Sequence, residues 1–253
     1  MQELTHLSLF SGIGGMDLAA EWADFKTVGQ CEWADYPTRV LEKHWPSVPK
    51  WRDIRTVTKE NFYEKTGLYT ATVVSGGDPC QPNSLAGLRK GNQDERFMWP
   101  EMFRVVKELL PTWVVNENVH GSISNRVAAK KCDDLESIGY RTWAFCIPAC
   151  AVGSRHFRQR VFIVSHLACE RMEGSCKEPL LGKLNLSNGQ ISQSFQEAER
   201  RFNTFESRLC RSLYGIPNGV DKLKRLGNAV VPQQIYPIFE AIKVIEHGVT
   251  VTA

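Results

Sequence analysis

The stretch LSLFSGIGGMDLAAEWA, residues 7–23, decides the fold. It begins with a short, mostly apolar run, continues through a glycine-rich turn at residues 11–15, and ends with apolar side chains at helical spacing. A short apolar run that ends at glycines is typical of a buried strand, and an amphipathic stretch is typical of a covering helix. Strand, turn and helix in this order predict the first unit of an α/β fold.

The same order recurs through the first two-thirds of the chain. Further strand-like runs lie at residues 27–28, 71–74, 113–115 and 161–164, and helix-like stretches lie at residues 36–45, 102–110 and 126–139. This alternation predicts a mostly parallel, doubly wound sheet, in which ligands bind at the carboxyl ends of the strands. Four of the five runs lead into polar or glycine-rich loops at that edge, whereas the triplet RQR precedes the fifth.

Composition places the chain among soluble globular proteins, with 253 residues, 42% hydrophobic and 23% charged. No apolar stretch approaches the roughly 18 to 20 residues that a membrane span needs, and the N-terminus lacks a signal-peptide pattern, so we expect a cytoplasmic protein. The eight cysteines include no C-x-x-C pair, which favours neither a disulfide framework nor a metal site. The net charge of +3 is weak evidence for any partner.

The sequence pattern and the charge distribution change near residue 165. Strand-like runs disappear, and basic residues outnumber acidic ones between residues 149 and 230, which suits either phosphate contacts or an unevenly charged surface. A last apolar-faced helix within residues 226–247 is expected to pack back onto the first domain. We therefore predict a catalytic and cofactor-binding domain at residues 1–164, completed by residues 220–253, and a small irregular region at residues 165–219.

The glycine-rich turn FSGIGG, residues 10–15, can approach a ligand closely. Glu32 follows the second strand-like run, where a carboxylate can accept hydrogen bonds from ribose hydroxyls. Asp17 occupies the place of the third glycine of the dinucleotide fingerprint, which disfavours a nicotinamide or flavin cofactor. A plain structural turn remains open at this point.

Three further features carry chemistry. Cys80 lies in SGGDPCQPNS, where Pro79 and Pro82 restrict the backbone on both sides of a thiol that is either structural or nucleophilic. Glu117 follows the run WVV. Burying a carboxylate there is costly unless it has a partner or a functional role, and Glu117 could cap a helix or pair with an arginine. Arg158 and Arg160 share one face if they lie on a strand, although an exposed strand entrance explains them equally.

In order and spacing, these features and LGNAVVPQ at residues 226–233 resemble the motif series of the cytosine-C5 DNA methyltransferases. The resemblance covers about residues 6–245, apart from residues 165–219, and implies a Rossmann-like fold that binds S-adenosyl-L-methionine. It implies these cofactor-binding residues: Phe10, Gly12, Gly14, Gly15, Glu32, Trp33, Asp53, Ile54, Asp78 and Asn228. It implies these catalytic residues: Cys80, Glu117, Arg158 and Arg160.

The resemblance also implies a reaction. Cys80 would add to carbon 6 of a cytosine that has been flipped out of duplex DNA, Glu117 would bond ring N3, and the arginines would bind the carbonyl oxygen at position 2. Residues 165–219 would recognise the target, although they are few for this family. His156, Ala151, Ala229 and Asn83 depart from frequent family residues, which puts cofactor affinity and loop closure in doubt.

The expected partner is double-stranded DNA, and the expected oligomeric state is a monomer. The chain would be either the modification half of a restriction system, with a cognate endonuclease, or a solitary phage-like enzyme. Two alternatives stay open, namely methylation of cytosine in RNA and a non-catalytic nucleic-acid-binding protein that keeps the cofactor loop.

Overall fold

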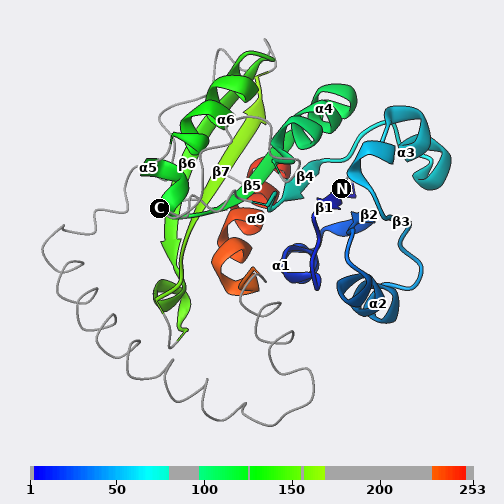
Figure 1. Cartoon of the computed structure of the whole chain (residues 1–253), viewed down its shortest axis with the longest axis horizontal. Coiled ribbons are helices and arrows are strands. Elements are labelled where there is room, and N and C mark those ends of the chain that lie inside the picture. Colours follow the sequence, from blue (N-terminus) through cyan, green and yellow to red (C-terminus); the bar gives the residue numbers. More distant parts are fainter. Residues whose placement is uncertain (1–2, 80–96, 125, 155–156, 169–229, 249–253) are drawn as a thin grey trace, which may run out of the picture.

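The computed structural model describes residues 3–79, 97–124, 126–154, 157–168 and 230–248. The described residues form a seven-stranded sheet in the order β3-β2-β1-β4-β5-β7-β6 (Figure 1). The strands are β1 (Thr5–Leu9), β2 (Lys26–Cys31), β3 (Lys50–Trp51), β4 (Val73–Gly76), β5 (Trp113–Val119), β6 (Tyr140–Pro148) and β7 (Gln159–Leu167). β1 to β5 pair in parallel, and β7 runs antiparallel to both of its neighbours.

Helices cover both faces of the sheet, and a core cluster fills each side. The helices are α1 (Gly15–Trp22), α2 (Asp35–His44), α3 (Lys59–Thr66), α4 (Trp99–Leu109), α5 (Gly121–Ser124), α6 (Val127–Glu136) and α9 (Pro232–Glu246), with short 3-10 turns η1 (Ile54–Thr56) and η2 (Ala149–Val152). Side chains of α3, α4 and α6 pack in one cluster, and those of α1 and α9 pack in the other. The predicted doubly wound, mostly parallel α/β fold is therefore confirmed.

The C-terminal helix α9 packs back onto the first strands, as the sequence predicts. The ring of Phe239 lies edge-on to the ring of His6 with a centroid distance of 5.3 Å, and it also packs against Phe25. Ile235 and Ile242 of the same helix are buried. A segment more than 200 residues from β1 in the sequence therefore completes the core beside it.

β7 continues to Leu167, three residues beyond the apolar run at residues 161–164, and the division into domains after residue 164 stays a prediction. The extension carries polar side chains, which end the apolar run without ending the strand. Ser165 hydrogen-bonds through its hydroxyl to the hydroxyl of Thr142 on β6 at 2.9 Å. Backbone pairing with β5 and β6 sets the end of this strand, whereas hydrophobicity does not.

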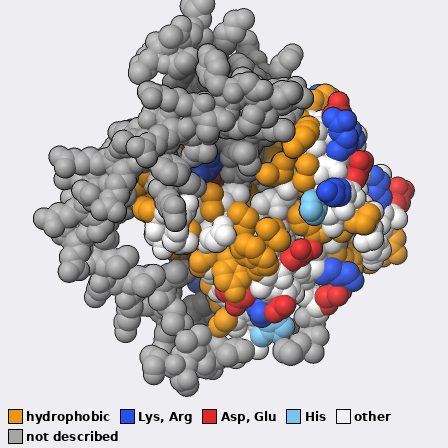
Figure 2. Space-filling model, turned by 90° about the horizontal axis from the view of Figure 1, so that it is seen from below, with side chains coloured by type: hydrophobic (Ala, Val, Ile, Leu, Met, Phe, Trp, Pro, Cys, Tyr) orange, Lys and Arg blue, Asp and Glu red, His pale blue; other side chains and the backbone are white. Residues whose placement is uncertain are grey.

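The described surface mixes charge and apolar side chains. From below, hydrophobic side chains gather near the centre of the visible described surface, and acidic and basic side chains border them (Figure 2). Trp22, Trp33 and Tyr36 are among the exposed aromatic side chains. None of the helices in the described residues has the length and apolar character that a membrane crossing requires.

Candidate active site

The neighbouring parallel strands β1, β4 and β5 lead into loops at one edge of the sheet. Leu9 at the end of β1 pairs with Gly76 of β4, and Gly76 pairs with Asn116 of β5. The chain steps outward from β1 to β2 and β3 and then returns to β4, so the topological switch lies between β1 and β4. In doubly wound sheets this is the place where ligands bind.

The loop after β1 is a strained turn. Phe10, Gly12 and Gly14 have φ angles of 52°, 56° and 88°. A left-handed conformation is unusual for a bulky residue such as Phe10 and persists where the surrounding structure enforces it. The carboxylate of Glu32 helps to hold the turn in this conformation, because it accepts hydrogen bonds from the backbone N–H of Gly12 at 2.9 Å and of Ala34 at 2.8 Å.

The start of α1 and the segment before α9 approach each other at Gly15. A Cβ atom on Gly15 would lie 2.5 Å from the carbonyl oxygen of Val230, which is closer than real Cβ contacts. Only glycine permits this approach. The C-terminal segment therefore returns to the loop that follows β1.

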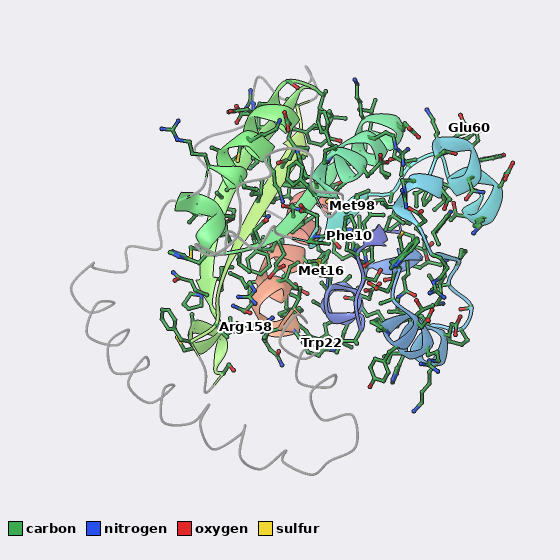
Figure 3. The ribbon with its side chains drawn as sticks, viewed as in Figure 1. Phe10, Met16, Trp22, Glu60, Met98 and Arg158 are labelled. Carbon is green, nitrogen blue, oxygen red and sulfur yellow. The ribbon has the colours of Figure 1, made fainter. Side chains whose placement is uncertain are left out.

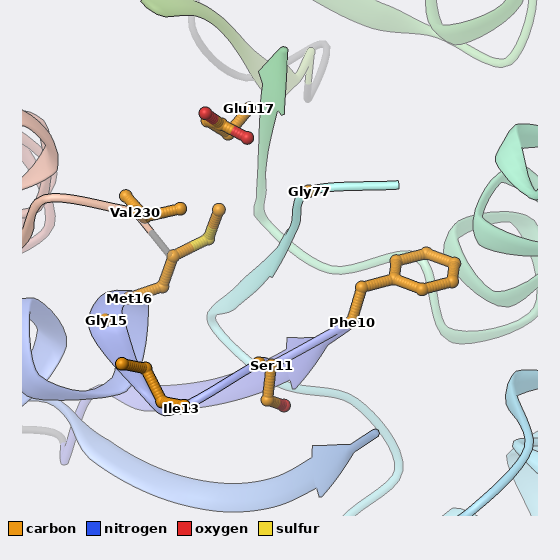
Figure 4. A pocket seen from close by; sticks show the side chains of 9 residues that line it. Phe10, Ser11, Ile13, Gly15, Met16, Gly77, Glu117 and Val230 are labelled. Carbon is orange, nitrogen blue, oxygen red and sulfur yellow. The ribbon is translucent and has the colours of Figure 1, made fainter. Parts of the chain in front are cut away.

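These segments enclose a pocket of about 330 Å³, part of it open to solvent. Its lining residues are Phe10, Ser11, Gly12, Ile13, Gly15, Met16, Gly77, Glu117 and Val230. Figure 4 shows Glu117 facing Met16 and the loop after β1 across this space. The glycine-rich loop and Glu117, which are a hundred residues apart in the sequence, thus share one pocket.

Glu117 forms an ion pair with Arg160, whose Nε lies 2.7 Å from the Glu117 Oε1. Burial raises the pKa of the Glu117 carboxyl, and the nearby charges of Arg160 and then Arg158 oppose that rise. Gly77 leaves room for this carboxylate, because a Cβ atom there would lie 2.9 Å from Glu117 Oε2. The predicted alternative in which Glu117 pairs with an arginine is therefore the arrangement in this structure.

Arg158 lies beside α9 (Figure 3). Burial, and then the charge of Arg160, lower the pKa of the Arg158 guanidinium to about 10, so it stays cationic near neutral pH. The side chain of Gln234 on α9 donates hydrogen bonds to the backbone carbonyl oxygens of Arg158 at 2.9 Å and of Ile147 at 2.7 Å. Gln234 thus fixes the backbone from which the guanidinium extends.

The residues expected around an adenosine lie at the ends of β2 and β3. Trp33 is 67% exposed, which leaves its ring free to stack on a ligand. Asp53 caps the 3-10 turn η1 and accepts hydrogen bonds from the backbone N–H and the side chain of Arg55. Ile54 is buried, and its carbonyl oxygen accepts a hydrogen bond from Arg104. None of these three residues lines the pocket described above.

Asp78 has a partner that the sequence did not indicate. Its buried carboxylate pairs with the ammonium group of Lys131, and it also accepts a hydrogen bond from Asn116 at 2.8 Å. Asp78 does not line the pocket. Its side chain is directed to Lys131 on α6, and its role in cofactor binding stays a prediction.

Two predicted site residues, Cys80 and Asn228, lie outside the described residues. Sequence reasoning also missed Lys131 and Gln234. A signal for Lys131 exists, because it lies three residues after Ala128 and four before Leu135, on the apolar stripe of its helix. A charged residue at such a position needs a buried partner.

The chain resembles known methyltransferases in sequence. The family model described as C-5 cytosine-specific DNA methylase matches residues 4–213. The type II methyltransferase M.FnuDI of Fusobacterium nucleatum is 31% identical over 200 residues, which cover 78% of this chain and 52% of the relative. M.AquIA of Picosynechococcus is 34% identical over 175 residues, which cover 63% of this chain and 71% of that relative.

Solved structures share the fold. DNMT2 of Spodoptera frugiperda, in a mutant form, matches with a TM-score of 0.55 and 21% identity over 65% of this chain and 50% of that one. A putative DNA modification methyltransferase encoded within a prophage of E. coli matches with a TM-score of 0.55 and 22% identity over 65% and 47%. The chain spans about half the length of M.FnuDI and of both structures.

Proposed function

Because this chain belongs to the C-5 cytosine-specific DNA methylase family, we propose that it transfers a methyl group from S-adenosyl-L-methionine to carbon 5 of cytosine in DNA. The observation that carries the proposal is the pocket shared by the loop after β1 and Glu117. It joins the segment that would hold a methyl donor to a carboxyl that would bind the base. In this proposal Arg160 completes the base-binding side through its contact with Glu117.

The residues around the pocket fit S-adenosyl-L-methionine, which supplies an electrophilic methyl group when bound. Each Glu32 oxygen accepts one backbone hydrogen bond, so the carboxylate keeps acceptor capacity for two ribose hydroxyls. The exposed ring of Trp33 would stack on the adenine. At Gly12 a Cβ atom would meet no other atom within 4 Å, so the loop presents open space to a ligand there. We keep Phe10, Gly14, Gly15, Asp53, Ile54 and Asn228 in the proposed cofactor site.

Carbon 5 of cytosine is a weak nucleophile until the ring is activated. In the proposed reaction the Cys80 thiolate adds to carbon 6, and electron density moves to carbon 5, which then accepts the methyl group. Glu117, in its protonated form, donates a hydrogen bond to ring N3 and stabilises the charge that develops there. Burial raises the pKa of Glu117, which favours the protonated form that this role requires. A base then removes the carbon 5 proton, and the thiolate leaves carbon 6.

Arg158 and Arg160 would supply the positive charge of the site. Arg160 contacts Glu117 in this structure, so base binding would require the guanidinium to exchange this partner for the carbonyl oxygen at position 2. Arg158 lies on the same side, and its charge also acts on Glu117. A cationic pair beside a cysteine lowers the pKa of the thiol and so raises its thiolate fraction.

Double-stranded DNA is the proposed substrate, and the target base would be flipped out of the stack to reach the pocket. Residues 165–219, proposed to recognise the target, lie largely outside the described residues. Several curated relatives carry the name type II methyltransferase, which supports a restriction-modification context for this chain.

The direct test is a base-resolution map of 5-methylcytosine in DNA from cells that express the wild type or Cys80→Ala. We expect methylated cytosines in one sequence context with the wild type and none with the variant. Transfer of tritiated methyl groups to purified duplex DNA and to transfer RNA separates the two substrate classes. Methylation that persists in Cys80→Ala would refute the thiol mechanism, and transfer to RNA alone would refute the DNA assignment.

A further inference from the structure

A buried polar cluster lies behind the proposed active site, on the face of the sheet that α6 covers. It consists of Asp78 after β4, Asn116 and Asn118 on β5, and Lys131 on α6. The side chains of Lys131 and Asp78 are each only 1% exposed. Burying a lysine is costly, so its environment must supply a partner for every donor.

All three donors of the Lys131 ammonium group are used. They reach one carboxylate oxygen of Asp78 and the side-chain oxygens of Asn116 and Asn118, the last two at 3.0 Å. The ammonium group also lies 5.1 Å from the centroid of the Trp99 ring. A fully satisfied network of this kind holds its members in one arrangement.

The cluster joins the ends of the two strands that carry the proposed chemistry. Asn116 donates hydrogen bonds to Asp78 at 2.8 Å and to the carbonyl oxygen of Gly76 at 3.0 Å. Asp78 is two residues before Cys80 in the sequence, and the two asparagines flank Glu117. Because side chains alternate along a strand, the asparagines point to the cluster while Glu117 points to the pocket.

We infer that Lys131 is a positioning residue for the proposed methyl transfer, and that its ion pair with Asp78 holds residues 77–79 against β5. The inference rests on the proposed function, since it concerns the same reaction. A buried ion pair seldom stabilises a fold more than apolar side chains of the same size, so stability alone does not account for this lysine. A positioning role accounts for Lys131, because its ion pair with Asp78 fixes the spacing between the segment that leads to Cys80 and the strand that carries Glu117.

The test compares three variants with the wild type. Asp78→Asn combined with Lys131→Met removes both charges, so no unpaired charge is left buried. Asn118→Ser is a milder change, because it removes one acceptor of Lys131 and leaves the ion pair intact. Tyr140→Phe is the matched control, since it removes a buried hydrogen bond of 2.6 Å to the Pro111 carbonyl oxygen at the opposite end of the sheet.

Two measurements are made on folded protein. The first is steady-state methyl transfer, where we expect kcat to fall at least about tenfold in the double variant while KM for S-adenosyl-L-methionine stays within about twofold. The second is the pH dependence of Cys80 alkylation by iodoacetamide, with the exposed Cys146 as internal reference. We expect its midpoint to move upward, toward about 8.5, the value of a free cysteine. Asn118→Ser should change both quantities in the same direction, and Tyr140→Phe should change neither.

A folded double variant that keeps the wild-type kcat and alkylation midpoint would overturn the inference, because the cluster would then be structural only. If the double variant does not fold, kcat and the Cys80 alkylation midpoint of Asn118→Ser test the inference in its place. If the wild type methylates no DNA, the proposed function fails, and the alkylation midpoint alone tests the positioning role of Lys131. A midpoint that moves in the variants but not in the control then supports the positioning role, and an unmoved midpoint refutes it.

Discussion

Asp17 is a buried carboxylate whose replacement by asparagine should stabilise the protein at neutral pH. Its side chain is fully buried in the first turn of α1 and accepts hydrogen bonds from Ser8 Oγ at 3.0 Å and Gln30 Nε2 at 2.9 Å. Burial raises its pKa to about 6, from 3.8 in the unfolded chain. Asparagine keeps the shape of the side chain and cannot ionise.

The pKa values give the sign and the size of the effect. The folded state favours protonated Asp17, so ionised Asp17 costs stability above pH 6, and this cost disappears as the pH falls below 3.8. A rise of about two pKa units corresponds to about 3 kcal/mol. The Oε1 atom of Gln30 has no hydrogen-bond partner in the part of the chain that the structure describes. A flipped Gln30 amide could therefore accept a hydrogen bond from the new asparagine.

Urea unfolding at pH 4 and pH 8 measures the effect. We expect Asp17→Asn to gain about 2–3 kcal/mol over the wild type between the two pH values. Any hydrogen bond lost through the substitution is independent of pH and cancels in this comparison. Asp133→Asn makes the same chemical change at an exposed position of α6 and should show no such gain. An equal stability difference at both pH values for Asp17→Asn would refute the reasoning.

Three further predictions concern single residues. Gly15→Ala would put a Cβ atom 2.5 Å from a backbone carbonyl oxygen, so calorimetry should show the Kd for S-adenosyl-L-methionine rising at least about tenfold, whereas Gly121→Ala, with open space around the new atom, should leave it unchanged. Glu117→Gln should lower kcat for methyl transfer more than about tenfold, and unchanged turnover would exclude its proposed role. His6 has a pKa of about 3 because it is buried, against 6.5 when unfolded, so its contribution to stability is present above pH 6.5 and is lost as the pH falls. Between pH 6.5 and pH 5 the wild type should lose about 2 kcal/mol relative to His6→Gln in urea unfolding, and parallel curves would contradict this.

The sequence predicts strands well where an apolar run is buried on both faces. β1, β4 and the first half of β5 are of this kind, and each starts within two residues of its predicted position. β3 has only two residues, which is too short for any periodic signal. β6 is the last strand in the sheet order and pairs with β7 alone, so many of its side chains are half-buried or exposed and its hydrophobic pattern is weak.

The candidate site is less predictable, because its supporting contacts cross the sheet. Glu117 could be selected from its place after an apolar run. The role of its two asparagine neighbours becomes visible only in the structure, where both accept hydrogen bonds from Lys131 on α6. The partner of Asp78 likewise lies 53 residues away. No local pattern records a contact of this range, although a lysine on the apolar stripe of a helix indicates that such a partner exists.

The direction of β7 decides whether the two arginines belong to the site at all. Arg158 and Arg160 precede the apolar run that they accompany, whereas the other polar loops follow theirs. On a parallel strand they would lie toward the opposite edge of the sheet, about 13–20 Å from Glu117 along the strand. The antiparallel pairing instead places Arg160 opposite Val119, with its Nε 2.7 Å from Glu117. Motif order alone could not give this result, because the reversal of one strand converts residues before the strand into residues at the ligand-binding edge.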